Sequence, residues 1–134
     1  MIFSKKEPNR LELGGESIPY VCDIAVLEQI QTEFGDLTQV DWKLRGFIPF
    51  RDKDGNVDLS KDGRQAVPDV KVVIRSLYLM IQEGLEITGE ELEITEADLK
   101  VQDELTIFEL AVKTWEAFNA CFLAGRRKTA KKTK

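Results

Sequence analysis

Residues 70–81 constrain the fold most, because they are apolar over more than one face of a helix. Apolar residues at the i, i+3, i+4, i+7 spacing of a single helical face are Val70, Val73, Ile74, Leu77 and Ile81. Val72, Leu79 and Met80 add apolar groups off that face. We predict a helix that ends at Gly84 and that is either central in the core or partly covered by another chain.

Two β-hairpins are suggested by turn chemistry. In residues 11–20, apolar residues alternate on both sides of Gly14 and Gly15, and these glycines supply the positive φ that a two-residue turn demands. Residues 51–66 are polar and contain two Asp-Gly pairs. This stretch is predicted to be a loop, or the projecting arm of a second hairpin around residues 47–60.

Capping residues mark three further helices. Asp23 is placed to cap a helix that ends at Gly35, and Asp36 is placed to cap a second, shorter one. Thr95 begins a pattern that resembles a capping box, with Asp in place of the usual Glu, and predicts a brief helix to about Val101.

The last predicted helix covers about residues 103–124. Its apolar residues recur at steps of three and four and are Leu105, Phe108, Val112, Trp115, Phe118 and Phe122. The expected fold class is therefore α+β and mostly α, with an N-terminal β-hairpin followed by four to five helices. We expect one mostly helical domain over residues 1–125 and a basic, disordered tail over residues 126–134.

The charge distribution favours protein partners. The formal net charge is −5, but six of the 19 basic residues lie in the last nine positions. The preceding residues carry 13 basic and 24 acidic side chains, a net charge of −11. An acidic body repels phosphate backbones and membrane surfaces, so nucleic acid and membranes are disfavoured as partners. The start of the chain lacks an apolar signal segment, and a cytoplasmic protein is expected.

No enzymatic chemistry is expected from this sequence. Histidine is absent, which removes the commonest proton-transfer residue and zinc ligand. The acidic run from Glu83 to Glu96 is interpreted as a solvated face, and the Asp-rich stretch near Gly55 lacks the spacing of a calcium loop. Cys22 and Cys121 are interpreted as buried free thiols. We therefore expect no catalytic residue, no cofactor site and no metal site.

Three stretches resemble a known family. They are LGGESIPY at 13–20 with LEQIQTEFG at 27–35, LYLMIQEG at 77–84, and WEAFN at 115–119. Their order is similar to that of tail assembly chaperones of long-tailed bacteriophages and prophages of Gram-positive bacteria. The resemblance implies a non-enzymatic role in which many copies bind the apolar tape measure protein in the host cytoplasm and help bring tail tube protein to it.

An exposed apolar ridge would suit such a client. The candidate interaction residues are Val72, Leu79, Met80, Trp115, Phe118 and Phe122. An aromatic stripe at helical spacing is more often core, although it could also continue into a homo-oligomer interface. The alternative is a structural tail or head-tail joining protein that oligomerises through the arm at residues 51–66. A nucleic-acid-binding regulator that uses the basic tail is a third reading.

Overall fold

The computed structural model describes residues 6–124 and is α+β, mostly helical, as predicted. In chain order the elements are β1 (Asn9–Leu13), β2 (Glu16–Tyr20), α1 (Ile24–Phe34), α2 (Leu37–Arg45), β3 (Phe47–Ile48), β4 (Arg64–Gln65), α3 (Val70–Thr88), α4 (Glu96–Val101), α5 (Ile107–Asn119) and a π-helical turn, η1 (Ala120–Ala124). The prediction of an N-terminal hairpin followed by four to five helices is confirmed, since residues 6–124 contain the five α-helices α1 to α5. The tail predicted at residues 126–134 lies outside the described residues.

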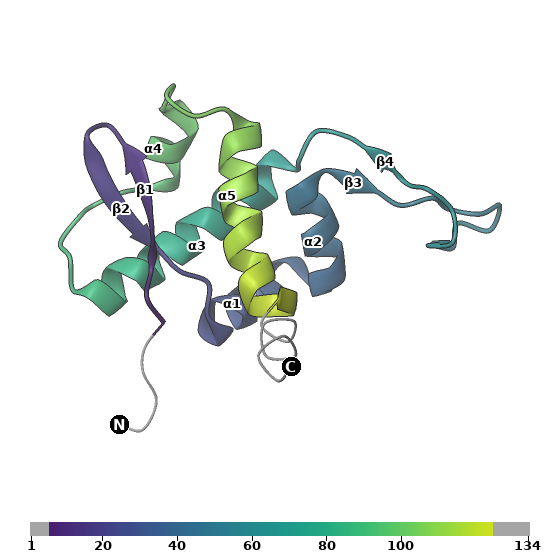
Figure 1. Ribbon diagram of the computed structural model, residues 1–134, viewed down its shortest axis with the longest axis horizontal. Coiled ribbons are helices and arrows are strands. Elements are labelled where there is room, and N and C mark those ends of the chain that lie inside the picture. The colour runs from purple at the N-terminus through teal and green to yellow at the C-terminus, as the bar shows by residue number, and fades with distance from the viewer. Residues whose placement is uncertain (1–5, 125–134) are drawn as a thin grey trace, which may run out of the picture.

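Helix α3 is the centre of the fold. It runs through the middle of the molecule, with α5 crossing it (Figure 1), and it contacts β2, α1, α2, α4 and α5. Four of the five predicted stripe residues and the off-stripe residues Val72, Leu79 and Met80 are buried, whereas Val70 at the start of the helix is exposed. Of the two alternatives for this helix, the structure therefore shows the first: neighbours from the same chain cover it on several sides.

The N-terminal hairpin forms as its glycines predict. β1 and β2 are antiparallel, and Gly14 and Gly15 have φ values of 59° and 79°. Leu11 and Ile18 face each other in the register and are both buried against the core. The hairpin thus covers one side of α3 and leaves its polar side chains in solvent.

Helix α3 does not end at Gly84 as predicted; it continues to Thr88, and Gly89 in the left-handed conformation follows it. Gly84 has a packing role instead. A Cβ atom at this position would lie 2.5 Å from the carbonyl oxygen of Pro19. The helix therefore accepts a glycine in its interior because β2 approaches its backbone at that point.

The predicted caps of the shorter helices are confirmed. The side chains of Asp23 and Asp36 accept hydrogen bonds from the backbone of the first turns of α1 and α2. Thr95 and Asp98 form the predicted capping box of α4, each side chain bonding to the other's backbone nitrogen.

Helix α5 begins later than predicted, at Ile107 and not near Asp103. A second capping box sets its start, in which Thr106 and Glu109 exchange bonds of 3.0 and 3.1 Å. Its α-helical part ends at Asn119.

Residues 47–66, called the arm below, project away from the helices (Figure 1). β3 pairs with β4, and one isolated bridge joins Arg51 to Val57. The arm is therefore a hairpin, but its second strand lies beyond residue 60, where the prediction ended. Its base is closed by the hydrogen bond of 2.7 Å from the Ala66 amide to the Gly46 carbonyl.

Within residues 6–124, no helix has the length and apolar character that a membrane crossing requires.

Candidate protein-interaction surface

The predicted apolar ridge on α3 is not exposed. Val72, Leu79 and Met80 are all buried beneath neighbouring elements, and Phe118 on α5 is completely buried. These four residues belong to the core of a single chain and cannot offer a surface to a partner in this conformation. The prediction was wrong on their exposure because spacing alone does not show how many sides of a helix its neighbours cover.

Trp115 and Phe122 are partly buried and pack against the core. Phe122 lies against Phe118, with 5.2 Å between the ring centroids. The indole Nε1 of Trp115 donates a hydrogen bond to the Asp41 carboxylate. Of the six predicted interaction residues, Trp115 borders the apolar hollow described next.

The exposed part of the α5 stripe is at Phe108 and Val112, whose side chains are 54% and 56% exposed. They border a hollow of about 190 Å³, called the apolar groove below. The apolar groove is lined by Leu44, Arg45, Gln65, Pro68, Phe108, Ala111, Val112 and Trp115. Exposed apolar surface of this kind, framed by polar residues, is typical of protein-binding sites.

Phe108 and Val112 belong to the apolar stripe predicted for the last helix, but they do not lie on the face that α5 buries. The side chains that α5 buries are Leu110, Ala111, Thr114, Ala117 and Phe118. Both sets have helical spacing. The buried set contains smaller residues, which let α5 pack closely on α2 and α3. The alanines at 111 and 117, which lie on the same helical face as Leu110 and Phe118, were the feature of the sequence that could have identified the buried face.

Arg45 forms the polar end of the apolar groove. Its guanidinium bonds to Asp41 at 2.8 Å and lies over the rings of Phe47 and Trp115, at 5.3 and 6.0 Å from their centroids. The ion pair and the aromatic contacts fix this side chain where α2, α5 and the base of the arm meet. The groove therefore has a rigid polar end and an apolar wall.

A second hollow, of about 320 Å³, lies between the N-terminal hairpin and α4. It is called the acid-rimmed crevice below, and it is lined by Leu13, Gly14, Glu16, Ile18, Leu92, Glu93, Ile94, Asp98, Leu99 and Gln102. Its floor is apolar, and its rim carries three carboxylates. The turn beside it is held by the Glu104 carboxylate, which accepts bonds of 3.0 and 3.1 Å from the Gly14 amide.

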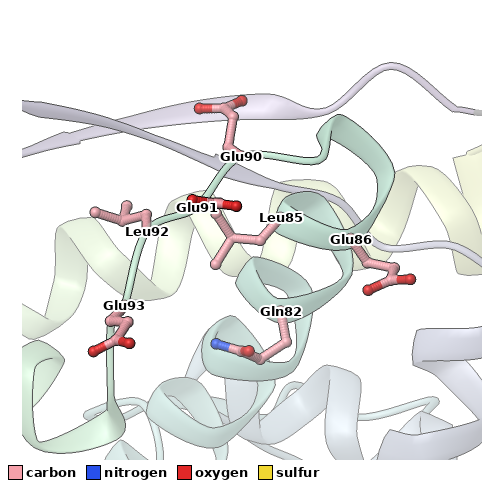
Figure 2. A pocket seen from close by; sticks show the side chains of 7 residues that line it. All are labelled: Gln82, Leu85, Glu86, Glu90, Glu91, Leu92 and Glu93. Atoms are coloured by element: carbon pink, nitrogen blue, oxygen red, sulfur yellow. The ribbon is translucent and has the colours of Figure 1, made fainter.

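A third, acidic hollow of about 600 Å³ lies at the end of α3. Its lining residues, Gln82, Leu85, Glu86, Glu90, Glu91, Leu92 and Glu93, are drawn in Figure 2. The four carboxylates point in different directions and do not converge on one point (Figure 2). Within the described residues, no group of three or more acidic or cysteine side chains could hold a metal ion.

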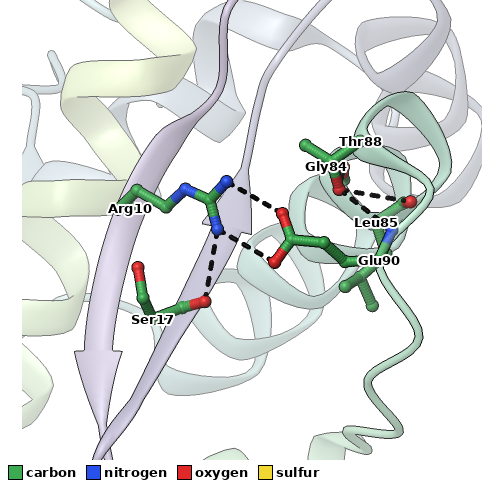
Figure 3. Close-up of polar contacts among 6 residues, drawn as sticks. All are labelled: Arg10, Ser17, Gly84, Leu85, Thr88 and Glu90. Carbon is green, nitrogen blue, oxygen red and sulfur yellow. Dashed lines mark hydrogen bonds and ion pairs between the residues drawn. The ribbon is translucent and has the colours of Figure 1, made fainter.

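Glu90 in this hollow has a structural partner. Arg10 on β1 pairs with it through two bonds of 2.8 and 3.0 Å and also donates to the Ser17 carbonyl (Figure 3). The hydrogen bond from Arg10 lowers the pKa of the Glu90 carboxyl. This pair ties the hairpin to the segment after α3 and is exposed to solvent.

Cys22 and Cys121 are free thiols that interact with each other. Cys22 is buried as predicted, whereas Cys121 is only partly buried. The hydrogen bond between the two thiols, together with burial, raises the pKa of Cys22. The same bond lowers the pKa of Cys121 to about 7. Because Cys121 is also the less buried of the two, it is the thiol that a reagent in solution reaches more easily.

Comparison with known protein families, with characterised proteins and with solved structures gives no match to this chain. Its function is therefore inferred from its surface and from the sequence resemblance.

Proposed function

We propose that this chain is a non-enzymatic assembly chaperone that binds an apolar helical client in the bacterial cytoplasm. Following the resemblance to phage tail assembly chaperones, the client is the tape measure protein, and the tail tube protein is the second partner. Many copies bind along one client, and each makes a modest contact.

The observation that carries this proposal is the exposed apolar surface of Phe108 and Val112 beside the apolar groove. These residues are four apart on α5, so they form one ridge along its outer side. The groove supplies an adjoining apolar wall at the partly buried Trp115. A client helix that presents side chains at i, i+3 and i+4 fits such a ridge and wall.

The acidic body supports the same role. Residues 1–125 carry a net charge of −11. Copies that cover an apolar client with their acidic faces outward would repel other coated clients and oppose aggregation.

Co-expression with the client tests the proposal. The tagged chain is produced together with the tape measure protein encoded nearby. The molar mass of the soluble complex is then measured by light scattering. We expect the client to become soluble only in the presence of several copies of this chain. Phe108→Asp should weaken capture by at least about tenfold, because it places a charge at the centre of the contact.

Ile24→Asp is the matched control, because Ile24 is also an exposed apolar residue at the start of a helix. It should leave client capture unchanged. Equal loss of capture in both variants, or a client that stays insoluble with the unmodified chain, would reject the proposal.

The projecting arm favours a second candidate function, that of a structural tail or head-tail joining protein. Arms that extend from a compact body commonly join subunits in assemblies. Mass spectrometry of finished particles separates the two functions. A structural subunit remains in the particle, whereas a chaperone is missing from it.

A further inference from the structure

The arm exposes apolar side chains away from the core. Leu59 is 69% exposed and Phe50 is 40% exposed, and Ile48 is also exposed. A two-stranded hairpin without a third strand or a helix against it is marginally stable in water. The arm therefore has apolar surface that a partner could bury with a gain in free energy.

The basic side chains of the arm are available to pair with acidic groups of a partner. The arm carries Arg51, Lys53, Lys61 and Arg64 against Asp52, Asp54, Asp58 and Asp62, a net charge of zero. Asp52 and Asp58 accept hydrogen bonds from backbone amides of the arm's own turns. Lys61 lies 5.4 Å from the centroid of the Phe50 ring. An aromatic group with a cation beside it is thus presented to solvent.

The acid-rimmed crevice is complementary to this end of the arm. Its apolar floor includes Leu92 and Ile94, and its volume of about 320 Å³ is in the range that accepts a bulky side chain. The carboxylates of Glu16 and Glu93 on its rim have no ion pair within residues 6–124. A basic side chain next to an apolar one could pair with these carboxylates while the apolar side chain lies on the floor.

The arm and the acid-rimmed crevice lie at opposite ends of the molecule. The arm extends from one end of the long axis, and the hairpin β1–β2 with α4 lies toward the other (Figure 1). The arm cannot fold back onto the crevice of its own chain without unfolding its base at Gly46 and Ala66. An arm that enters the crevice would therefore have to come from another copy.

We propose that the arm of one copy docks in the acid-rimmed crevice of a second copy, with Phe50 and Leu59 on the apolar floor and Lys61 at the rim. This head-to-tail contact uses different surfaces on the two partners, so it repeats into a ring or an open filament. It leaves the apolar groove free and does not depend on the proposed client, since only this chain takes part.

Sedimentation velocity over a range of protein concentrations tests the contact. We expect the average mass of the particles formed by the unmodified chain to increase as the protein concentration is raised, over a range that extends to about 1 mM. Leu59→Asn removes the apolar contact of the arm, and Glu93→Lys reverses a charge on the rim. Each should weaken self-association by about tenfold or more. Both positions are exposed, so circular dichroism should show an unchanged fold.

A mixture of the two variants gives the sharpest result. Leu59→Asn retains an intact crevice, and Glu93→Lys retains an intact arm. Only one productive contact can form between them, so the mixture should yield complexes of two chains and no larger species. Lys71→Glu, which reverses an exposed charge on α3, is the control and should associate like the unmodified chain.

Three results would overturn the inference. The unmodified chain could retain the mass of one copy at every concentration. Either variant could associate as strongly as the unmodified chain. The mixture could contain no two-chain complex, or only complexes larger than two chains.

Discussion

Trp115 on α5 donates a hydrogen bond of 2.6 Å from its indole Nε1 to Oδ1 of Asp41 on α2, across 74 positions of sequence. Asp41 is buried, and its other carboxylate oxygen bonds to Arg45 at 2.8 Å. A buried carboxylate needs partners for both oxygens. Arg45, on the same helix as Asp41, supplies one, and the bond from Trp115 supplies the other and joins α5 to α2. Two of the three residues, Arg45 and Trp115, also line the apolar groove.

Replacing Trp115 with Phe should lower the free energy of unfolding by about 1–3 kcal/mol. Phe retains most of the apolar contact but leaves one oxygen of the buried Asp41 carboxylate without its donor. Urea unfolding measures the change. If the loss is as large in an Asp41→Ala background, which has no acceptor for the indole, the hydrogen bond is not its cause.

Gly84→Ala should destabilise the protein by about 1–3 kcal/mol, the range typical of overpacking. Alanine is otherwise the better residue inside a helix by about 1 kcal/mol. The new Cβ, however, would lie 2.5 Å from the Pro19 carbonyl oxygen and would force β2 away from α3. Thermal unfolding at fixed pH measures the loss.

Gly89→Ala is the companion variant for Gly84→Ala. Gly89 has a φ of 71° and open space around it, so alanine there meets only backbone strain, of about 1–2 kcal/mol. Loss of the hairpin's contact with α3 should appear in hydrogen exchange at Val21, whose amide donates to the Met80 carbonyl at 3.1 Å. We expect faster exchange at Val21 in Gly84→Ala only. Equal exchange in both variants would contradict the steric explanation.

These glycines show which parts of the fold were predictable. Gly14 and Gly15 were assigned correctly because a two-residue turn is a local requirement. Gly84 was assigned wrongly as a helix end. A glycine is required there because the backbone of Pro19, 65 positions away in sequence, packs against it. Local turn and capping rules therefore predicted the hairpin and most helix starts, whereas a contact between distant segments explains the glycine inside α3.

The candidate surface was predictable only in part. The stripe of α5 was recognised, but its orientation was not, because two sets of residues share helical spacing. Packing of Ala111 and Ala117 against neighbouring helices decided the choice and turned Phe108 and Val112 outward. The hollow that these residues border also needs Leu44 from α2, and no local pattern brings α2 and α5 together.

Cys121 should react with iodoacetamide at a rate that rises through about pH 7, where its pKa lies. An ordinary cysteine reaches the same stage near pH 8.5, because only the thiolate is nucleophilic. Cys22→Ala removes the hydrogen bond that lowers this pKa and should move the profile to higher pH. An unchanged profile in that variant would show that Cys22 does not stabilise the thiolate.

The last prediction concerns Arg75 on α3, which joins two other helices. Its guanidinium bonds to Glu33 on α1 at 2.8 and 3.0 Å and to Glu96 on α4 at 3.0 Å. The hydrogen bond from Arg75 lowers the pKa of Glu33 below its ordinary value of 4.5. All three side chains are about one-third exposed, so each pair should contribute no more than about 1 kcal/mol.

Replacing Arg75 with Met should therefore reduce stability by about 1 kcal/mol at pH 7. A carboxyl whose pKa is lower in the folded state contributes its full stabilisation above its unfolded pKa and loses it as the pH falls through the folded one. The difference between Arg75→Met and the unmodified chain should thus be constant above pH 5 and shrink as the pH falls below about 4. Urea unfolding at several pH values measures it. A difference that persists undiminished at pH 2 would assign the effect to the contact of Arg75 with the Tyr78 ring, 5.6 Å away, because a cation–π contact does not titrate with a carboxyl.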